Sequence, residues 1–120
     1  MRDNFLGGSE YSLMEIIWDN APIPSGELAA ICEQIHGWKR TTVYTMVKRL
    51  SDKGLIKNDK SNIMYIKSRS EIQKQQSEDV VKRNFMGSLP MFVNAFLGDK
   101  SLSKEDATKL IDLIEKHTED

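Results

Sequence analysis

A short stretch near the middle of the chain gathers side chains that can bind nucleic acid. Residues 38–50 read WKRTTVYTMVKRL, and their apolar positions recur at the three- and four-residue spacing of one helix face: Val43, Met46, Val47 and Leu50. The basic and hydroxyl side chains fall outside this stripe, clustered toward the amino end: Lys39, Arg40, Thr41, Thr42, Tyr44, Thr45 and Lys48. This pattern is typical of a helix that reads DNA, because its amino-terminal half enters the major groove while the opposite face packs on the domain.

The residue types in this helix suggest two kinds of contact with DNA. Lys39, Arg40 and Lys48 are the candidates for phosphate contacts, because their charges neutralise the backbone and the helix N-terminus adds its own positive end. Threonine offers a hydroxyl group for hydrogen bonding and a methyl group for contact with thymine. The candidates for contacts with base edges are Thr41, Thr42, Tyr44 and Thr45. We therefore predict that the partner is double-stranded DNA.

The charge of the chain is distributed unevenly. The whole chain has a formal net charge of −1, which by itself argues against nucleic acid. Residues 36–70 nevertheless hold nine basic and two acidic side chains, a net +7 in 35 residues, whereas residues 71–120 hold seven basic and ten acidic ones. A local basic surface on a nearly neutral chain is typical of proteins that bind phosphate groups.

The segments before this stretch complete a helix-turn-helix pattern. We expect a short arm over residues 1–8, a first helix over about 9–20, and a second over about 26–36 with Ser25 as its N-cap. Gly37 permits the left-handed geometry that ends a helix, and the turn Gly37-Trp38-Lys39 then leads into the recognition helix of the stretch at 38–50. Trp18 and Trp38 are predicted to be core anchors, because duplex DNA hides the faces of its bases.

The segment after Gly54 predicts a β-hairpin. Residues 55–58 and 64–67 alternate apolar and polar side chains around an expected turn at 59–62, and Ile23 is a candidate for an additional short strand. Lys57, Lys60 and Lys67 of this hairpin are candidates for contacts with flanking phosphates. Residues 1–70 are therefore predicted to form a winged helix-turn-helix DNA-binding domain, mainly α with a small β-hairpin.

The last fifty residues predict three helices, the third capped by Ser103. Three short helices bury too little surface by themselves, so we expect residues 71–120 to form a helical homodimerisation domain. The predicted dimer contacts are its apolar side chains: Phe85, Phe92, Phe96, Leu110, Ile111 and Ile114. A dimer presents two recognition helices to half-sites about one DNA turn (~34 Å) apart. The alternative is that this tail packs back onto its own hairpin.

Catalysis, metal binding and membrane insertion find little support in the sequence. His36 and His117 have no metal-ligand spacing, and the single cysteine, Cys32, lies among apolar residues at helical spacing. This spacing favours a buried Cys32 over a redox-sensing thiol. The sequence contains neither an apolar run that could cross a bilayer nor a signal-peptide pattern. We expect a cytoplasmic protein that is not an enzyme and has no cofactor or metal.

Three segments, in order, resemble the BlaI/MecI/CopY family of bacterial repressors. The first is EYSLMEIIWD at 10–19, the second is TVYTMVKRLSDKGLI at 42–56, and the third runs from FMGS at 85–88 to LSKE at 102–105. The resemblance covers nearly the whole chain. It implies a dimeric winged-helix repressor that occupies a pseudo-palindromic operator and blocks transcription.

The resemblance also implies how such a repressor is released. In beta-lactam-resistance members, a membrane sensor protease triggers cleavage at an Asn-Phe pair in the dimerisation region, where this chain has Ala95 and Phe96. Copper-responsive members bind metal through C-terminal Cys-x-Cys pairs that this sequence lacks, so we expect no copper sensing by that route. Two alternatives stay open: a winged-helix protein–protein interaction module, and a repressor that senses a small molecule held between its subunits.

Overall fold

The computed structural model describes residues 6–119 of the 120-residue chain. Residues 1–5, which belong to the arm expected over 1–8, and residue 120 lie outside the described part. The chain divides into two compact units, Met1–Val80 and Val81–Asp120. The predicted domain boundary after residue 70 falls ten residues earlier than the division at 80/81, at the start of the helix Arg69–Asn84, which spans that division. The predicted domain organisation stays a prediction.

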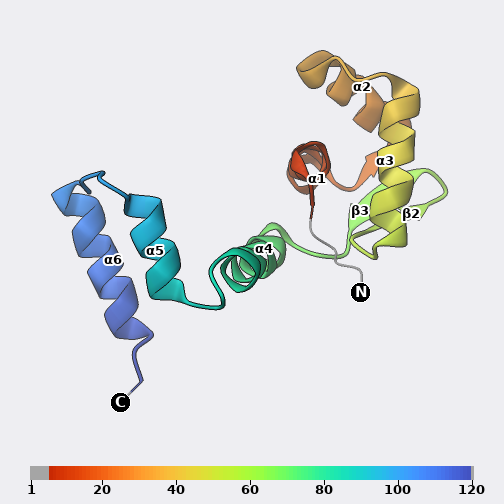
Figure 1. The fold of residues 1–120 in the computed structure, drawn as a ribbon. Coiled ribbons are helices and arrows are strands. Elements are labelled where there is room, and N and C mark those ends of the chain that lie inside the picture. Colours follow the sequence, from red (N-terminus) through yellow and green to blue (C-terminus); the bar gives the residue numbers. More distant parts are fainter. Residues whose placement is uncertain (1–5, 120) are drawn as a thin grey trace. The chain divides into compact units, whose positions relative to one another are not determined.

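The first unit has the predicted winged helix-turn-helix architecture (Figure 1). Three helices, α1 (Gly8–Asn20), α2 (Ser25–His36) and α3 (Arg40–Asp52), precede a small sheet, and α4 (Arg69–Asn84) begins after it. The three strands are β1 (Ile23–Pro24), β2 (Ile56–Asp59) and β3 (Asn62–Tyr65), in the antiparallel order β1-β3-β2. The predicted class, mainly α with a small β element, is confirmed.

One apolar core joins these elements. The buried stripe of α3 is the predicted one: Val43, Met46, Val47 and Leu50. Trp18 and Trp38 are half-buried and pack against this core, which confirms their prediction as anchors. Cys32 is fully buried, and burial raises the pKa of its thiol to about 11. Because the reactive thiolate is scarce at neutral pH, the prediction of a packing role for Cys32 is confirmed.

The additional strand and the turn of the hairpin lie where the sequence predicted them. Ile23 pairs with Ile63, so the predicted additional strand is confirmed. The four-residue turn expected at 59–62 is confirmed: Asp59 pairs with Asn62, and the two central residues, Lys60 and Ser61, lie at φ 52° and 66°. Two left-handed residues match the twist of a hairpin, but neither lysine nor serine is the usual sequence signal for such a turn.

Three expected boundaries are shifted. The strand expected at 64–67 ends at Tyr65, because the amides of the next two residues both donate to the carbonyl of Leu55, at 2.8 and 3.2 Å. Ser25 is not the N-cap of α2 but its first residue, and its amide donates to the carbonyl of Ser61 at 2.8 Å. The helical stretch, predicted from Trp38, begins at Arg40, which confirms the turn predicted at 37–39. The predicted helix end at Gly37 is confirmed, with φ 70°.

The end of the expected N-terminal arm is part of the core. Leu6 is 3% exposed and belongs to the same apolar cluster as α1 and α3. Its backbone amide donates to the side-chain oxygen of Gln76 in α4 at 2.7 Å. An isolated leucine before two glycines gives no periodic signal, so the sequence did not predict this anchor.

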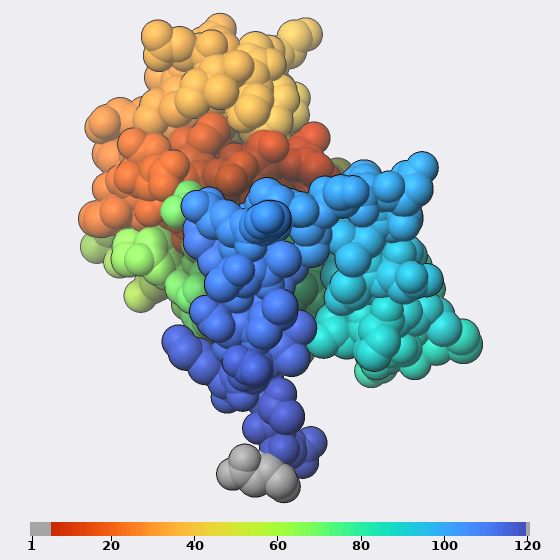
Figure 2. Space-filling view, turned by 90° about the vertical axis from the view of Figure 1, so that its left-hand side faces the viewer, coloured from red at the N-terminus to blue at the C-terminus, as the bar shows by residue number. Residues whose placement is uncertain are grey.

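The second unit contains the end of α4 and two further helices, α5 (Leu89–Leu97) and α6 (Lys104–Lys116). Ser88 caps α5, and the prediction that Ser103 caps α6 is confirmed by its hydrogen bond from the amide of Asp106 at 3.0 Å. No residue of α5 or α6, both described throughout, is buried. Figure 2 draws this unit from cyan to blue, with the side chains of α6 at the molecular surface.

Candidate nucleic-acid interface

The amino-terminal half of α3 displays the predicted polar side chains on its surface. All seven candidates on this helix and its N-cap are exposed: Lys39, Arg40, Thr41, Thr42, Tyr44, Thr45 and Lys48. Val43, which lies among them in the sequence, is fully buried. The helix therefore separates one face that packs on the core from one face that is open to a partner, as a DNA-reading helix requires.

Two hydrogen bonds organise this face. The Nη1 of Arg40 donates to the hydroxyl oxygen of Tyr44, one helical turn away, at 3.1 Å. This bond uses one of five guanidinium donors, so Arg40 keeps donors for a phosphate. The hydroxyl of Thr45 donates to the carbonyl of Thr41 at 2.9 Å, which leaves its oxygen lone pairs and its methyl group for a base.

Depressions lie along both sides of α3. An open groove of about 580 Å³ is lined by α3 and the hairpin: Tyr44, Val47, Lys48, Ser51, Asp52, Asn58 and Ser61, together with Ser25. A second depression of about 240 Å³ is lined by Thr41, Thr42, Thr45, Met46 and Arg49. The larger depression therefore lies between α3 and the hairpin, whereas the smaller one lies on the surface of α3 itself.

The hairpin lysines are exposed as predicted candidates for phosphate contacts. Lys57 lies on β2, Lys60 in the two-residue turn, and Lys67 after β3. Sequence reasoning missed Ser25, Asn58 and Ser61, which line the groove beside α3. The one signal in the sequence was Ile23 as a candidate strand, because its pairing with the hairpin brings Pro24, next to Ser25, opposite Asn62, next to Ser61.

Some of the positive charge counted in the sequence is used inside the protein. The Nζ of Lys53 pairs with Glu10 at 2.9 Å, and their side chains are only 25% and 14% exposed, so Lys53 serves the fold. Lys48 pairs with Asp52 at 3.6 Å, but both side chains are mostly exposed. Since exposed pairs of this kind are weak, Lys48 stays available to a phosphate.

The predicted dimer contacts divide into two groups within the second unit. The Phe85 and Phe92 rings are half-buried and meet edge-to-face with centroids 5.3 Å apart. The other four are exposed by 43–63%: Phe96, Leu110, Ile111 and Ile114. Three of these, Leu110, Ile111 and Ile114, lie within about one turn of α6, and neighbouring exposed apolar side chains are typical of a surface that another protein chain covers.

The described part of the chain contains neither a cluster of metal ligands nor a membrane-spanning helix. Among residues 6–119, no group of three or more His, Cys, Asp or Glu side chains is placed to hold a metal ion. No helix in the same range combines the length and apolar character needed to cross a bilayer. His36, which has no metal-ligand spacing in the sequence, stacks on the ring of Trp38, with ring centroids 4.3 Å apart.

Comparisons with known proteins cover both units. A family model described as penicillinase repressor matches residues 6–116. The penicillinase repressor of Bacillus licheniformis is 25% identical over 116 residues, which cover 93% of this chain and 91% of that protein. The methicillin resistance regulatory protein MecI of Mammaliicoccus sciuri, like that of Staphylococcus aureus strain N315, is 22% identical over 115 residues, or 92% of this chain and 94% of the relative.

Proposed function

We propose that this chain, which belongs to the penicillinase repressor family and is a transcriptional repressor, acts as a homodimer on a pseudo-palindromic operator in double-stranded DNA. The family consists of repressors and not of enzymes. The observation that carries the proposal is the exposed polar face of α3, set opposite its buried stripe.

In this proposal the polar face of α3 enters the major groove and the hairpin follows the backbone. Lys39, Arg40 and Lys48 contact phosphates on the flanks of the groove, and Lys57, Lys60 and Lys67 contact phosphates farther out. The hydroxyl and aromatic side chains between them read base edges: Thr41, Thr42, Tyr44 and Thr45. Exposure of every one of these residues supports the assignment.

The first expected result concerns salt. Because each neutralised phosphate releases counterions, the logarithm of operator affinity should fall with the logarithm of salt concentration with a slope of about −5 or steeper. This slope corresponds to at least a roughly 30-fold loss between 0.1 and 0.2 M salt. Fluorescence anisotropy with a duplex from the promoter of the protein's own gene measures it. Lys60→Ala should flatten the slope by about 2, because each of the two subunits in the proposed dimer loses one phosphate contact.

Lys109→Ala is the control for this measurement, because it removes an exposed cation from α6 and should leave the slope unchanged. A wild-type protein whose binding to duplex DNA is weak and insensitive to salt would contradict the proposal. That result would favour the protein–protein interaction module.

We also propose release by cleavage between Ala95 and Phe96. Both residues lie near the end of α5, a helix without a buried residue in the single chain, so a subunit that separates from its partner presents this pair to a protease at little cost. The cut separates α6 and its apolar residues from the winged helix. In cells containing the membrane sensor protease implied by the family resemblance, mass spectrometry after induction should detect a fragment that ends at Ala95. An intact chain that has left its operator would instead support the small-molecule alternative.

A further inference from the structure

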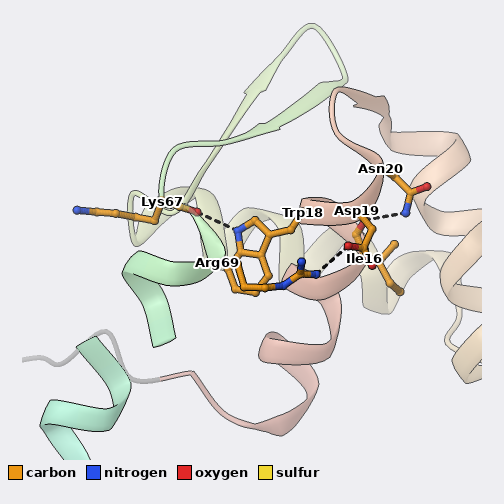
Figure 3. Close-up of polar contacts among 6 residues, drawn as sticks. All are labelled: Ile16, Trp18, Asp19, Asn20, Lys67 and Arg69. Atoms are coloured by element: carbon orange, nitrogen blue, oxygen red, sulfur yellow. Dashed lines mark hydrogen bonds and ion pairs between the residues drawn. The ribbon is translucent and has the colours of Figure 1, made fainter. Parts of the chain in front are cut away.

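Three contacts fasten the last turn of α1 to the start of α4 (Figure 3). The indole Nε1 of Trp18 donates to the carbonyl oxygen of Lys67 at 2.9 Å, and the Nη2 of Arg69 pairs with the Oδ1 of Asp19 at 2.8 Å. The guanidinium carbon of Arg69 also lies 5.2 Å from the centre of the Trp18 ring, within the range of a cation–π contact. We call Trp18, Asp19, Arg69 and the Lys67 carbonyl the α1–α4 latch.

The helix ends on both sides of the latch are themselves capped. The side-chain amide of Asn20 donates to the carbonyl of Ile16 at 2.8 Å and closes the end of α1. Ser68 and Glu71 exchange hydrogen bonds of 2.9 and 3.2 Å at the start of α4, in the pattern of a capping box. Hydrogen bonds from Ser68 lower the pKa of the Glu71 carboxyl below its ordinary value, and the bond from the backbone amide of Ser68 has the largest effect.

The first half of α4 is also anchored beyond the latch. Ile72 is 2% exposed and belongs to the core of the winged helix. One turn later, the side chain of Gln76 accepts the hydrogen bond from the amide of Leu6. The latch and these two contacts therefore fix the direction in which α4 leaves the first unit.

Alpha-helix α4 then continues without interruption into the second unit, which holds the proposed dimer contacts. We propose that the α1–α4 latch sets the half-site spacing that the dimer accepts, with Trp18, Asp19 and Arg69 as positioning residues that do not touch DNA. This inference rests on the proposed function, because half-sites have meaning only for a dimer on an operator.

Helix length shows why a small change at the latch matters. Alpha-helix α4 has 16 residues, so at 1.5 Å per residue it is about 24 Å long. A tilt of ~10° at its first turn displaces its far end by ~4 Å, which is about the 3.4 Å rise of one base pair. Losing the latch should therefore let the dimer accept operators that are one base pair too long or too short.

Variants with opposite changes of charge test the proposal. Arg69→Gln removes a positive charge and Asp19→Asn a negative one, while Trp18→Phe keeps an aromatic ring but removes the indole donor. We compare binding to operators with the native spacing and with one base pair added or removed. In all three variants, the ratio of the affinity for the operator with native spacing to the affinity for the operators with altered spacing should be at least about threefold lower than in wild type. Lys74→Gln is the matched control, because it also removes a cation from α4 and breaks the exposed Lys74–Glu78 pair.

Each outcome decides between the latch and simpler explanations. Affinity for a single half-site should be the same in all variants, and a parallel loss there would overturn the proposal by showing damage to the winged helix itself. Retention of the wild-type spacing ratio in Arg69→Gln and Asp19→Asn also overturns it. A wild-type protein that binds none of these duplexes refutes the proposed function, and the latch proposal with it.

Discussion

Replacing Ile114 with aspartate is expected to lower affinity for a two-half-site operator at least about 100-fold. Ile114 is 63% exposed on α6, next to Leu110 and Ile111, and the proposed dimer covers these side chains. A carboxylate buried there without a partner disfavours association, and a monomer loses the avidity gained by linking two half-site contacts. Sedimentation velocity measures the dimer, and anisotropy with one-site and two-site duplexes measures the loss of avidity.

Thr108→Asp is the matched control, because it places the same charge on the polar side of α6. It should leave both the dimer and operator affinity unchanged. Phe96→Asp, on α5, should reproduce the effect of Ile114→Asp from a second element. Half-site affinity should stay at the wild-type value in all three variants, which shows that the winged helix is folded. A dimer that persists in both Phe96→Asp and Ile114→Asp, with unchanged operator affinity, would contradict the proposed role of this surface.

The features that the sequence predicted correctly depend on neighbours along the chain. The buried stripe of α3 follows from the helical repeat alone, and Gly37 ends α2 because it adopts a left-handed conformation at little cost. Ser103 caps α6 through an amide three residues away. The exposure of the polar face of α3 was predictable for the same reason: one helical repeat that buries Val43 and Val47 turns Thr41 and Thr45 outward.

The features that the sequence did not predict are contacts between distant segments. The position of the hairpin turn was predicted, but the left-handed conformation of Lys60 and Ser61 is set by the pairing of β2 with β3, not by the turn residues themselves. Lys53, counted with the basic surface, pairs with Glu10 of α1. A lysine side chain looks the same in the sequence whether it meets a phosphate or a carboxylate from another helix. The same holds for Arg69, whose partner Asp19 precedes it by fifty residues.

Replacing Thr41, Thr42 and Thr45 together with alanine is expected to lower operator affinity at least about 100-fold while leaving binding to random-sequence DNA unchanged. Each lost base contact costs ~1–3 kcal/mol, and the dimer loses each contact twice. Non-specific binding should persist because every lysine and arginine that is proposed to contact a phosphate is retained. Alanine is the best helix former, and all three threonines are exposed, so α3 should stay folded. Competition between operator and random-sequence duplexes measures both affinities.

Thr108→Ala is the control for this triple substitution. The hydroxyl of Thr108 donates to the carbonyl of Lys104 at 2.9 Å, just as the hydroxyl of Thr45 donates to the carbonyl of Thr41 at 2.9 Å. The two threonines therefore differ in the surface they occupy and not in their local bonding. If the triple variant kept its preference for operator over random DNA, the base-reading role of this face would be refuted. An equal loss on both duplexes would instead assign the threonines to the backbone, where they position the dimer without reading its sequence.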